Sequence, residues 1–176
     1  SMIWILPVIQ SRDGISHVLK NIVTSSKPRK TDKYGHDLSD NEIAQKILVA
    51  VDGSVSSMRA LNYVNYVMKE SSNIKVYLTH IIEWSDDDES MDEEMTLKME
   101  QDGRKMLLGI SLPSKLKNYE RIVKLGDPAK KISELASSIN ADTIVMGRKG
   151  LSDTDSNLGH VTTKVLSLTS KPVVLV

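Results

Sequence analysis

Short apolar runs rich in β-branched residues recur five times from Lys46 onward, and amphipathic stretches separate them. The runs cover Ile47–Val51, Ile74–Ile82, Ile122–Leu125, Thr143–Met146 and Val173–Val176. Because polar and apolar residues do not alternate in them, they are typical of strands buried on both faces of a parallel sheet. Four strand–helix repeats and a final strand predict an α/β fold with an open parallel sheet. Crossover connections are right-handed, so helices are expected on both faces.

The stretches between the runs have the spacing of helices that bury one face. Their apolar positions are Ala60, Leu61, Val64, Val67 and Met68, then Met95, Met99, Met106 and Ile110, then Ile132, Leu135, Ala136 and Ile139, and finally Val161, Val165 and Leu168. Asp127 is a capping residue placed directly before Pro128, which suits the first position of a helix. The carboxylates of Asp92, Glu93 and Glu94 suit the positive end of the second helix.

Composition excludes several classes of protein. Lysine plus arginine equals aspartate plus glutamate at 23 each, so the formal net charge is zero and no nucleic-acid partner is expected. The absence of cysteine excludes disulfide scaffolds, thiolate zinc sites and a cysteine nucleophile, and it agrees with a cytoplasmic location. No apolar run approaches the ~18–20 residues that a membrane-spanning helix needs.

Residues 1–44 are interpreted as an N-terminal extension in front of a domain at 45–176. Apolar residues from Ile15 to Val23 predict an amphipathic helix over about residues 13–24, and a polar linker follows at 25–42. This helix docks either on the domain or a partner, or on a membrane surface, since the apolar stub Met2–Ile9 precedes it and basic residues follow. Membrane association is expected only through this extension or through a region upstream of it.

The segment SDDDESMDEE at residues 85–94 has seven carboxylates and no basic residue. Such a cluster can bind Ca²⁺, but the alternating spacing and mid-loop glycine of an EF-hand are missing. We therefore interpret the segment as a solvated connection between the second strand and the second helix.

The segment from Val145 to Thr163 carries the clearest candidate for a binding site. A buried strand ends at Gly147, Gly150 follows after two residues, and Gly159 follows after eight more, directly before a helix. Glycines let backbone N–H groups approach a ligand, and a helix N-terminus offers N–H donors and a positive dipole end to phosphate. The spacing differs from a Walker A loop and from the GxGxxG fingerprint. The alternative is that these glycines only make turns.

Catalytic chemistry is not expected. No Ser/His/Asp constellation, metal-ligand spacing or nucleophile–base pair is recognisable, so we assign no catalytic residue and no metal ligand. Slow ATP hydrolysis is the most that we expect from this chain as an enzyme. His80 follows an apolar strand and is interpreted as structural, while His17 and His36 lie in the extension without a partner pattern.

The chain from Lys46 to Val176 resembles the universal stress protein family across essentially the family's whole length. The matching segments are Ile47–Ser54, Leu78–Ile81, Gly126–Pro128, Ala141–Gly147, the glycine segment and Lys171–Val176. The resemblance implies a Rossmann-like open sheet of five parallel strands in the order 3-2-1-4-5. It also implies a homodimer formed through the C-terminal strand, Val173–Val176, whose apolar edge has no charged residue to prevent pairing.

The resemblance further implies a small-molecule nucleotide ligand, because some members of the family bind ATP. Those members resemble G-x2-G-x9-G-(S/T) at the glycine segment, whereas here the second gap is eight residues and His160 replaces the serine or threonine. The implied pocket places Ala50 and Val51 beside the base, Asp52 at the adenosine portion and the backbone of Ile81 at the adenine edge. The residues implied to hold ribose and phosphates are Gly147, Arg148, Gly150, Gly159, His160 and Val161.

The expected ligand is therefore ATP or another adenine nucleotide such as AMP. Free N–H groups are expected at Gly159, His160 and Val161. The hydroxyls of Thr162 and Thr163 are candidates for the missing side-chain contact. Asp153 and Asp155 add two carboxylates beside the phosphates, which points to Mg²⁺ as a companion of a triphosphate.

Three classes of function stay open at this stage. The first is a nucleotide-responsive regulatory or stress protein that acts through its dimer state. The second is the regulatory domain of a membrane transporter, on the cytosolic face of the membrane. The third is a slow ATP hydrolase or an interaction module that does not bind nucleotide.

Overall fold

The computed structural model describes residues 44–68, 73–85, 87, 92–112, 114, 116–151 and 158–176. Strands and helices alternate along them in the order β1 (Gln45–Ala50), α2 (Val55–Met68), β2 (Ile74–Glu83), α3 (Glu93–Gly109), β3 (Tyr119–Gly126), α4 (Pro128–Ser138), β4 (Thr143–Met146), α5 (His160–Leu168) and β5 (Val173–Leu175). The predicted N-terminal helix, its polar linker and most of the acidic segment lie outside the described residues.

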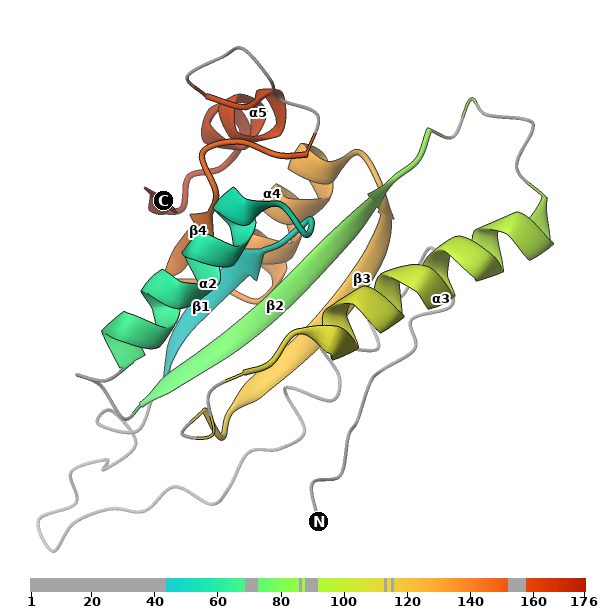
Figure 1. The fold of residues 1–176 in the computed structure, drawn as a ribbon. Helices are drawn as coiled ribbons and strands as arrows, with labels where there is room; N and C mark the ends of the chain where they lie inside the picture. Colours follow the sequence, from blue (N-terminus) through green and yellow to red (C-terminus); the bar gives the residue numbers. More distant parts are fainter. Residues whose placement is uncertain are drawn as a thin grey trace, which may run out of the picture.

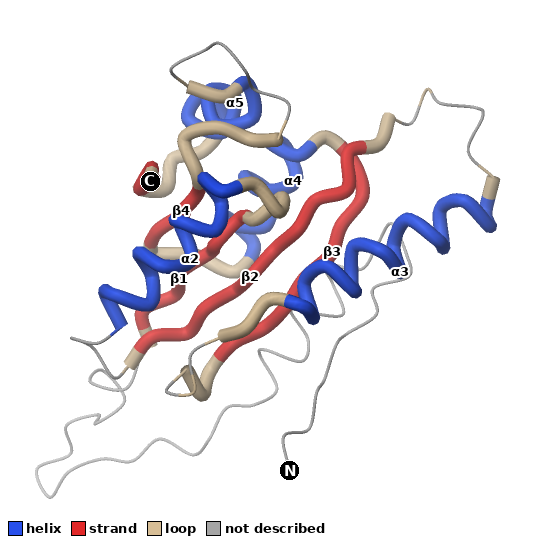
Figure 2. The backbone as a smooth tube through the Cα atoms, viewed as in Figure 1, coloured by secondary structure: helices blue, strands red, loops and turns tan. Residues whose placement is uncertain are grey.

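The five strands form one parallel sheet in the order β3-β2-β1-β4-β5, which confirms the predicted fold (Figures 1 and 2). The central strand β1 pairs with β2 on one side and with β4 on the other, so Ala50 lies opposite both Thr79 and Met146. The chain therefore leaves β1 in one direction and later returns on its other side. The carboxyl ends of β1 and β4 flank this switch point, where open α/β sheets bind their ligands.

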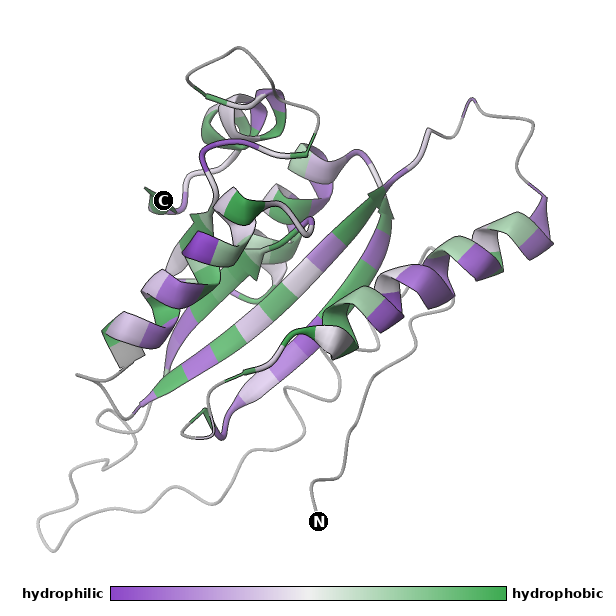
Figure 3. Cartoon of the chain, in the orientation of Figure 1, coloured by the Kyte–Doolittle hydropathy of each residue, from purple (hydrophilic) through white to green (hydrophobic). Residues whose placement is uncertain are grey.

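Two helices pack on each face of the sheet, and each face has its own apolar core. The core under α2 and α3 contains Val49, Leu61 and Leu107, and the core under α4 and α5 contains Leu48 and Ala136. Figure 3 shows the hydrophobic residues concentrated in the strands, while α3 is largely hydrophilic on the side in view. No described helix combines the length and the hydrophobicity that crossing a membrane would require.

Carboxylates cap the starts of α3 and α4, as was predicted for Asp127. The Asp92 carboxylate accepts a hydrogen bond from the Met95 amide at 2.8 Å, and Glu93 follows in the first turn of α3. The Asp127 carboxylate accepts from the Lys130 amide at 2.8 Å at the start of α4. These contacts satisfy amides that have no partner inside the helix.

Burial differs from the predicted pattern at three places. β3 begins at Tyr119, before the predicted run, and so includes Arg121, which is buried. This burial is possible because the Arg121 guanidinium donates to the Leu107 and Ile110 carbonyl oxygens at 3.0 and 2.9 Å. Leu168 of α5 is 51% exposed, because the buried face of that helix is formed by Thr162 and Val165. Met95 is 49% exposed, since the first turns of α3 extend past the sheet (Figure 1).

Candidate functional site

The predicted site residues come from three separate segments, and the fold places all three segments at the edge of the sheet that is formed by the carboxyl ends of its strands. Ala50 is the last residue of β1 and is followed by Val51 and Asp52, Ile81 lies in β2, and the glycine segment connects β4 to α5. Hydrogen bonds join these segments directly. The structure thus brings these segments together, and their role as a binding site remains a proposal.

The carboxylate of Asp52 lies between the β1–α2 turn and the glycine segment. One oxygen accepts from the Ser54 amide at 2.9 Å, and the other accepts from the Leu151 amide at 3.1 Å. Burial raises the pKa of the Asp52 carboxyl, but the hydrogen bonds from Ser54, Ser57 and Leu151 outweigh it, so the pKa lies below its usual value. Asp52 is therefore a fixed negative charge at this edge near neutral pH.

The backbone N–H and C=O groups of Ile81 point toward the β1 side of β2, at a level beyond the last residue of β1. The Val51 amide donates to the Thr79 carbonyl oxygen at 2.9 Å, so the backbone groups of Thr79 point toward β1. The Trp84 amide donates to the Gly126 carbonyl oxygen at 3.2 Å, so the backbone groups of Trp84 point toward β3. Because these directions alternate along a strand, Ile81 points the same way as Thr79. Its N–H and C=O therefore face the space beyond the end of β1.

Gly147 is required for packing against the first turn of α2. A Cβ added at Gly147 would lie 2.5 Å from the Ser56 Oγ and 2.7 Å from the Ser56 carbonyl carbon. The Ser56 Oγ also accepts from the Lys149 amide at 3.4 Å, which is a long contact. At Gly147 the glycine thus serves the close approach of two backbones, and the expectation that it holds a phosphate is not needed to explain it.

The N-terminus of α5 lies directly against the glycine segment. Its N-cap residue is Gly159, which has no side chain to cap the helix. The expected free N–H group at Gly159 is wrong, because this amide donates to the Arg148 carbonyl oxygen at 2.7 Å. This bond joins the two ends of the connection. The exposed His160 follows Gly159 and begins α5, a helix of nine residues. The first-turn amides and the dipole of α5 therefore form the positive end that an anion would meet.

The two threonine hydroxyls are engaged with the backbone. The Thr162 hydroxyl is buried and donates to the Gly147 carbonyl oxygen at 3.0 Å, and the Thr163 hydroxyl donates to the Gly159 carbonyl oxygen at 2.9 Å. The expectation that Thr162 faces a ligand is therefore wrong, because its hydroxyl ties α5 to the end of β4. Asp153 and Asp155, on which the expected dependence on Mg²⁺ rests, lie outside the described residues.

His80 has a structural contact, as the sequence suggested. Its Nδ1 lies 2.9 Å from the Val51 carbonyl oxygen and so joins the end of β2 to the end of β1. Within the described part of the chain, no group of three or more acidic residues or histidines is arranged to hold a metal ion. Sequence reasoning missed Ser56 and Leu151, because nothing in their local sequence signals a backbone contact to a distant segment.

The last strand is joined to the same edge. The Val176 amide donates to the Met146 carbonyl oxygen at 3.1 Å, and the Val176 carbonyl oxygen accepts from the Arg148 amide at 3.0 Å. The Ser56 hydroxyl donates to the same Val176 oxygen at 3.2 Å. The glycine segment is thus anchored on one side by α2 and on the other by the residue that follows β5.

Comparisons with known proteins agree with this architecture. The model of the Universal stress protein family matches residues 44–176. The solved structure of hypothetical protein MJ0577 is 26% identical, with a TM-score of 0.66, and the alignment covers 76% of this chain and 96% of that one. Universal stress protein UspA from Lactobacillus plantarum is 17% identical, with a TM-score of 0.62 and coverage of 75% and 97%.

A universal stress protein solved in complex with cAMP is 23% identical, with a TM-score of 0.50 and coverage of 76% of this chain and 97% of that one. At this level of identity the likeness concerns the fold. The search of the curated proteins gave no match.

Proposed function

The chain belongs to the universal stress protein family, and from this premise we propose that it is a nucleotide-responsive regulatory protein that binds an adenine nucleotide. The observation that carries the proposal is the N-terminus of α5, which has a glycine N-cap and lies beside the ends of β1 and β4. A helix end of this kind attracts phosphate at the place where open α/β sheets bind ligands.

The adenosine end of the ligand fits the other half of the same edge. The Ile81 backbone offers one donor and one acceptor beyond the end of β1, which suits the edge of an adenine ring. Ala50 and Val51 are apolar and mostly buried, so they supply a surface beside the base. The ribose then lies near Asp52, and the phosphates lie between the glycine segment and the first turn of α5, at Arg148, Gly150, His160 and Val161.

The relative solved with cAMP supports the class of ligand, because a member of the same family holds an adenine nucleotide. This support is general, and the choice among ATP, ADP and AMP rests on experiment. The eight-residue gap between Gly150 and Gly159 and the histidine at position 160 depart from the motif of the ATP-binding members, so we expect the affinity for ATP to be weakened.

The binding test begins with denaturation of the purified protein and chromatography of any released nucleotide. Titration calorimetry of stripped protein with ATP, ADP and AMP then measures the affinity. Gly159→Val should abolish binding, because a branched side chain blocks approach to the first turn of α5. Gly109→Val is the matched control, since a Cβ there meets nothing within 4 Å. No heat from any of the three nucleotides would refute the proposal and leave the interaction module as the better reading.

We also propose that the regulatory state is a homodimer formed through the C-terminal strand. β5 is an edge of the described sheet, and Val173, Val174, Leu175 and Val176 are only half-buried. Such an edge offers unpaired backbone groups to a second copy. Val174→Lys should give a monomer in analytical ultracentrifugation, whereas Val55→Lys, at a position 72% exposed on α2, should stay dimeric. A Val174→Lys variant that stays dimeric with unchanged affinity would exclude this interface.

A further inference from the structure

Asp52 joins two loops that are far apart in the sequence. Its carboxylate accepts the Leu151 amide at 3.1 Å across 99 positions of the chain. Its other oxygen accepts the Ser54 amide at 2.9 Å within the β1–α2 turn. Both oxygens are therefore engaged with backbone N–H groups, and one of these groups belongs to the glycine segment.

We infer that Asp52 is a positioning residue for the glycine segment, which it holds through Leu151, and that it acts chiefly on the phosphate end of a bound nucleotide. The second half of this inference, the action on the phosphate end of the nucleotide, rests on the proposed function. The first half, the holding of the loop, concerns the protein alone and is tested without any ligand.

The surroundings of Leu151 explain why this hydrogen bond matters. The Leu151 side chain is 72% exposed, so apolar burial does little to fix this residue. The neighbouring contact of the Lys149 amide with the Ser56 Oγ is long at 3.4 Å. A charged acceptor makes a stronger hydrogen bond than a neutral one, so the Asp52 carboxylate is the stronger of these two anchors.

Asp52→Asn separates this role from a simple effect of charge. A carboxylate near a phosphate repels it, so removing the charge alone should strengthen the binding of AMP. An asparagine of the same size has one acceptor oxygen and turns an NH₂ donor toward either Ser54 or Leu151. It therefore loses one of the two contacts, and a released glycine segment should weaken the binding of AMP. The two explanations predict opposite signs.

The experiment compares wild type, Asp52→Asn and Asp127→Asn. Asp127→Asn is the matched control, because it makes the same chemical change in the β3–α4 turn, where the carboxylate caps α4 by accepting the Lys130 amide at 2.8 Å. Thermal melts establish that each variant folds. Amide hydrogen exchange at Leu151 reports on the loop, and calorimetry with adenosine and with AMP reports on the two ends of the ligand.

We expect the Leu151 amide to exchange on the order of tenfold faster in Asp52→Asn than in wild type or Asp127→Asn, because a hydrogen bond to a charged group is lost. The affinity for AMP should fall on the order of tenfold, and the affinity for adenosine should change less than about twofold. Asp127→Asn should leave both affinities within about twofold of wild type.

Each other outcome counts against a stated part of the inference. Equal exchange at Leu151 in wild type and Asp52→Asn would overturn the holding of the loop. Equal losses for adenosine and AMP would make Asp52 a contact of the adenosine portion, and tighter AMP binding would leave only a charge effect. If wild type binds neither probe, the proposed function and the role of Asp52 toward phosphate both fail, while the exchange result still decides whether Asp52 holds the loop.

Discussion

Two turns end a parallel strand and begin a helix on the same face of the sheet, and they are held in different ways. The β3–α4 turn is closed by its own residues: Gly126 has a φ of 138°, Asp127 caps α4 and Pro128 begins the helix. The β4–α5 connection begins at Gly147 and ends at Gly159, which has no side chain for a cap.

The β4–α5 connection is held instead by distant segments, through Asp52, Ser56 and Val176. The Asp127 side chain lies at the positive end of α4, whereas the glycine N-cap of α5 places no side chain at the positive end of that helix. The candidate site thus lies where a capping side chain is absent and the anchoring contacts come from distant segments.

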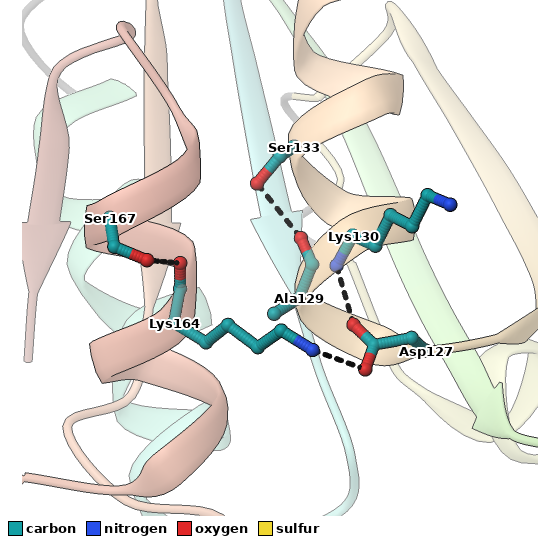
Figure 4. Close-up of polar contacts among 6 residues, drawn as sticks. All are labelled: Asp127, Ala129, Lys130, Ser133, Lys164 and Ser167. Atoms are coloured by element: carbon teal, nitrogen blue, oxygen red, sulfur yellow. Dashed lines mark hydrogen bonds and ion pairs between the residues drawn. The ribbon is translucent and has the colours of Figure 1, made fainter.

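An ion pair connects α5 to the N-cap residue of α4. Figure 4 shows the Lys164 side chain of α5 reaching the Asp127 carboxylate, which also accepts the Lys130 amide. The Lys164 Nζ lies 2.7 Å from the Asp127 oxygen, and both side chains are substantially exposed. An exposed pair of this kind contributes at most about 1 kcal/mol, so it adjusts the position of α5 only weakly.

The largest expected effect comes from Gly147→Ala, which breaks the remote anchoring. The new methyl group would meet the Ser56 backbone at 2.7 Å, so α2 or the glycine segment must move. We expect a loss of about 3 kcal/mol in the free energy of unfolding, measured by urea denaturation, together with weaker nucleotide binding. Gly109→Ala is the control and should raise stability by up to about 1 kcal/mol, because it adds a helix-favouring residue in open space. Equal effects of both substitutions would contradict the close packing at Gly147.

A smaller effect is expected from Asp127→Ala, which breaks the local cap. The variant removes the hydrogen bond to the Lys130 amide and the ion pair with Lys164. The free energy of unfolding should fall by about 1 kcal/mol, as for other N-cap losses, while the affinity for AMP should stay within about twofold of wild type. A large loss of AMP affinity would mean that the β3–α4 turn belongs to the site.

The smallest expected effect is a difference in the response to acid and salt. Burial raises the pKa of the Asp52 carboxyl, but its hydrogen bonds lower the pKa by more, so the net shift is downward. The hydrogen bond from Lys164 lowers the pKa of the Asp127 carboxyl. A carboxyl whose pKa is lower in the folded state stabilises the protein above its unfolded pKa of ~4, and this stabilisation is lost as the pH falls through the folded pKa.

Both carboxyls should therefore contribute to a loss of stability below about pH 4. High salt should reduce the contribution of Asp127, which depends on an exposed ion pair, more than that of Asp52, which depends on backbone amides. Urea denaturation of Asp52→Asn and Asp127→Ala across pH 2–6 at two salt concentrations measures both contributions. An equal response to salt would contradict the assigned causes.

Much of the fold could be predicted from the sequence, and so could the segments of the site. The five apolar runs correspond to the five strands, and Asp127 caps its helix as predicted. Asp92, which was expected only as a favourable charge at the start of α3, is the N-cap of that helix. The order of the strands came from the resemblance to a family, because the spacing of apolar residues does not state which strands are neighbours. The burial of Arg121 was missed, since a charged residue in a strand is ordinarily exposed.

The sequence by itself determined the features that depend on residues within a few positions of each other: strand and helix periods, helix caps and the glycine spacing. The tertiary structure alone decided what these residues contact. Arg121 is buried because the crossover brings the end of α3 over β3, and Gly147 is confined because α2 crosses the end of β4. Asp52 meets Leu151 through a backbone amide, which every residue but proline carries, so no side-chain pattern in the sequence could have identified this partner.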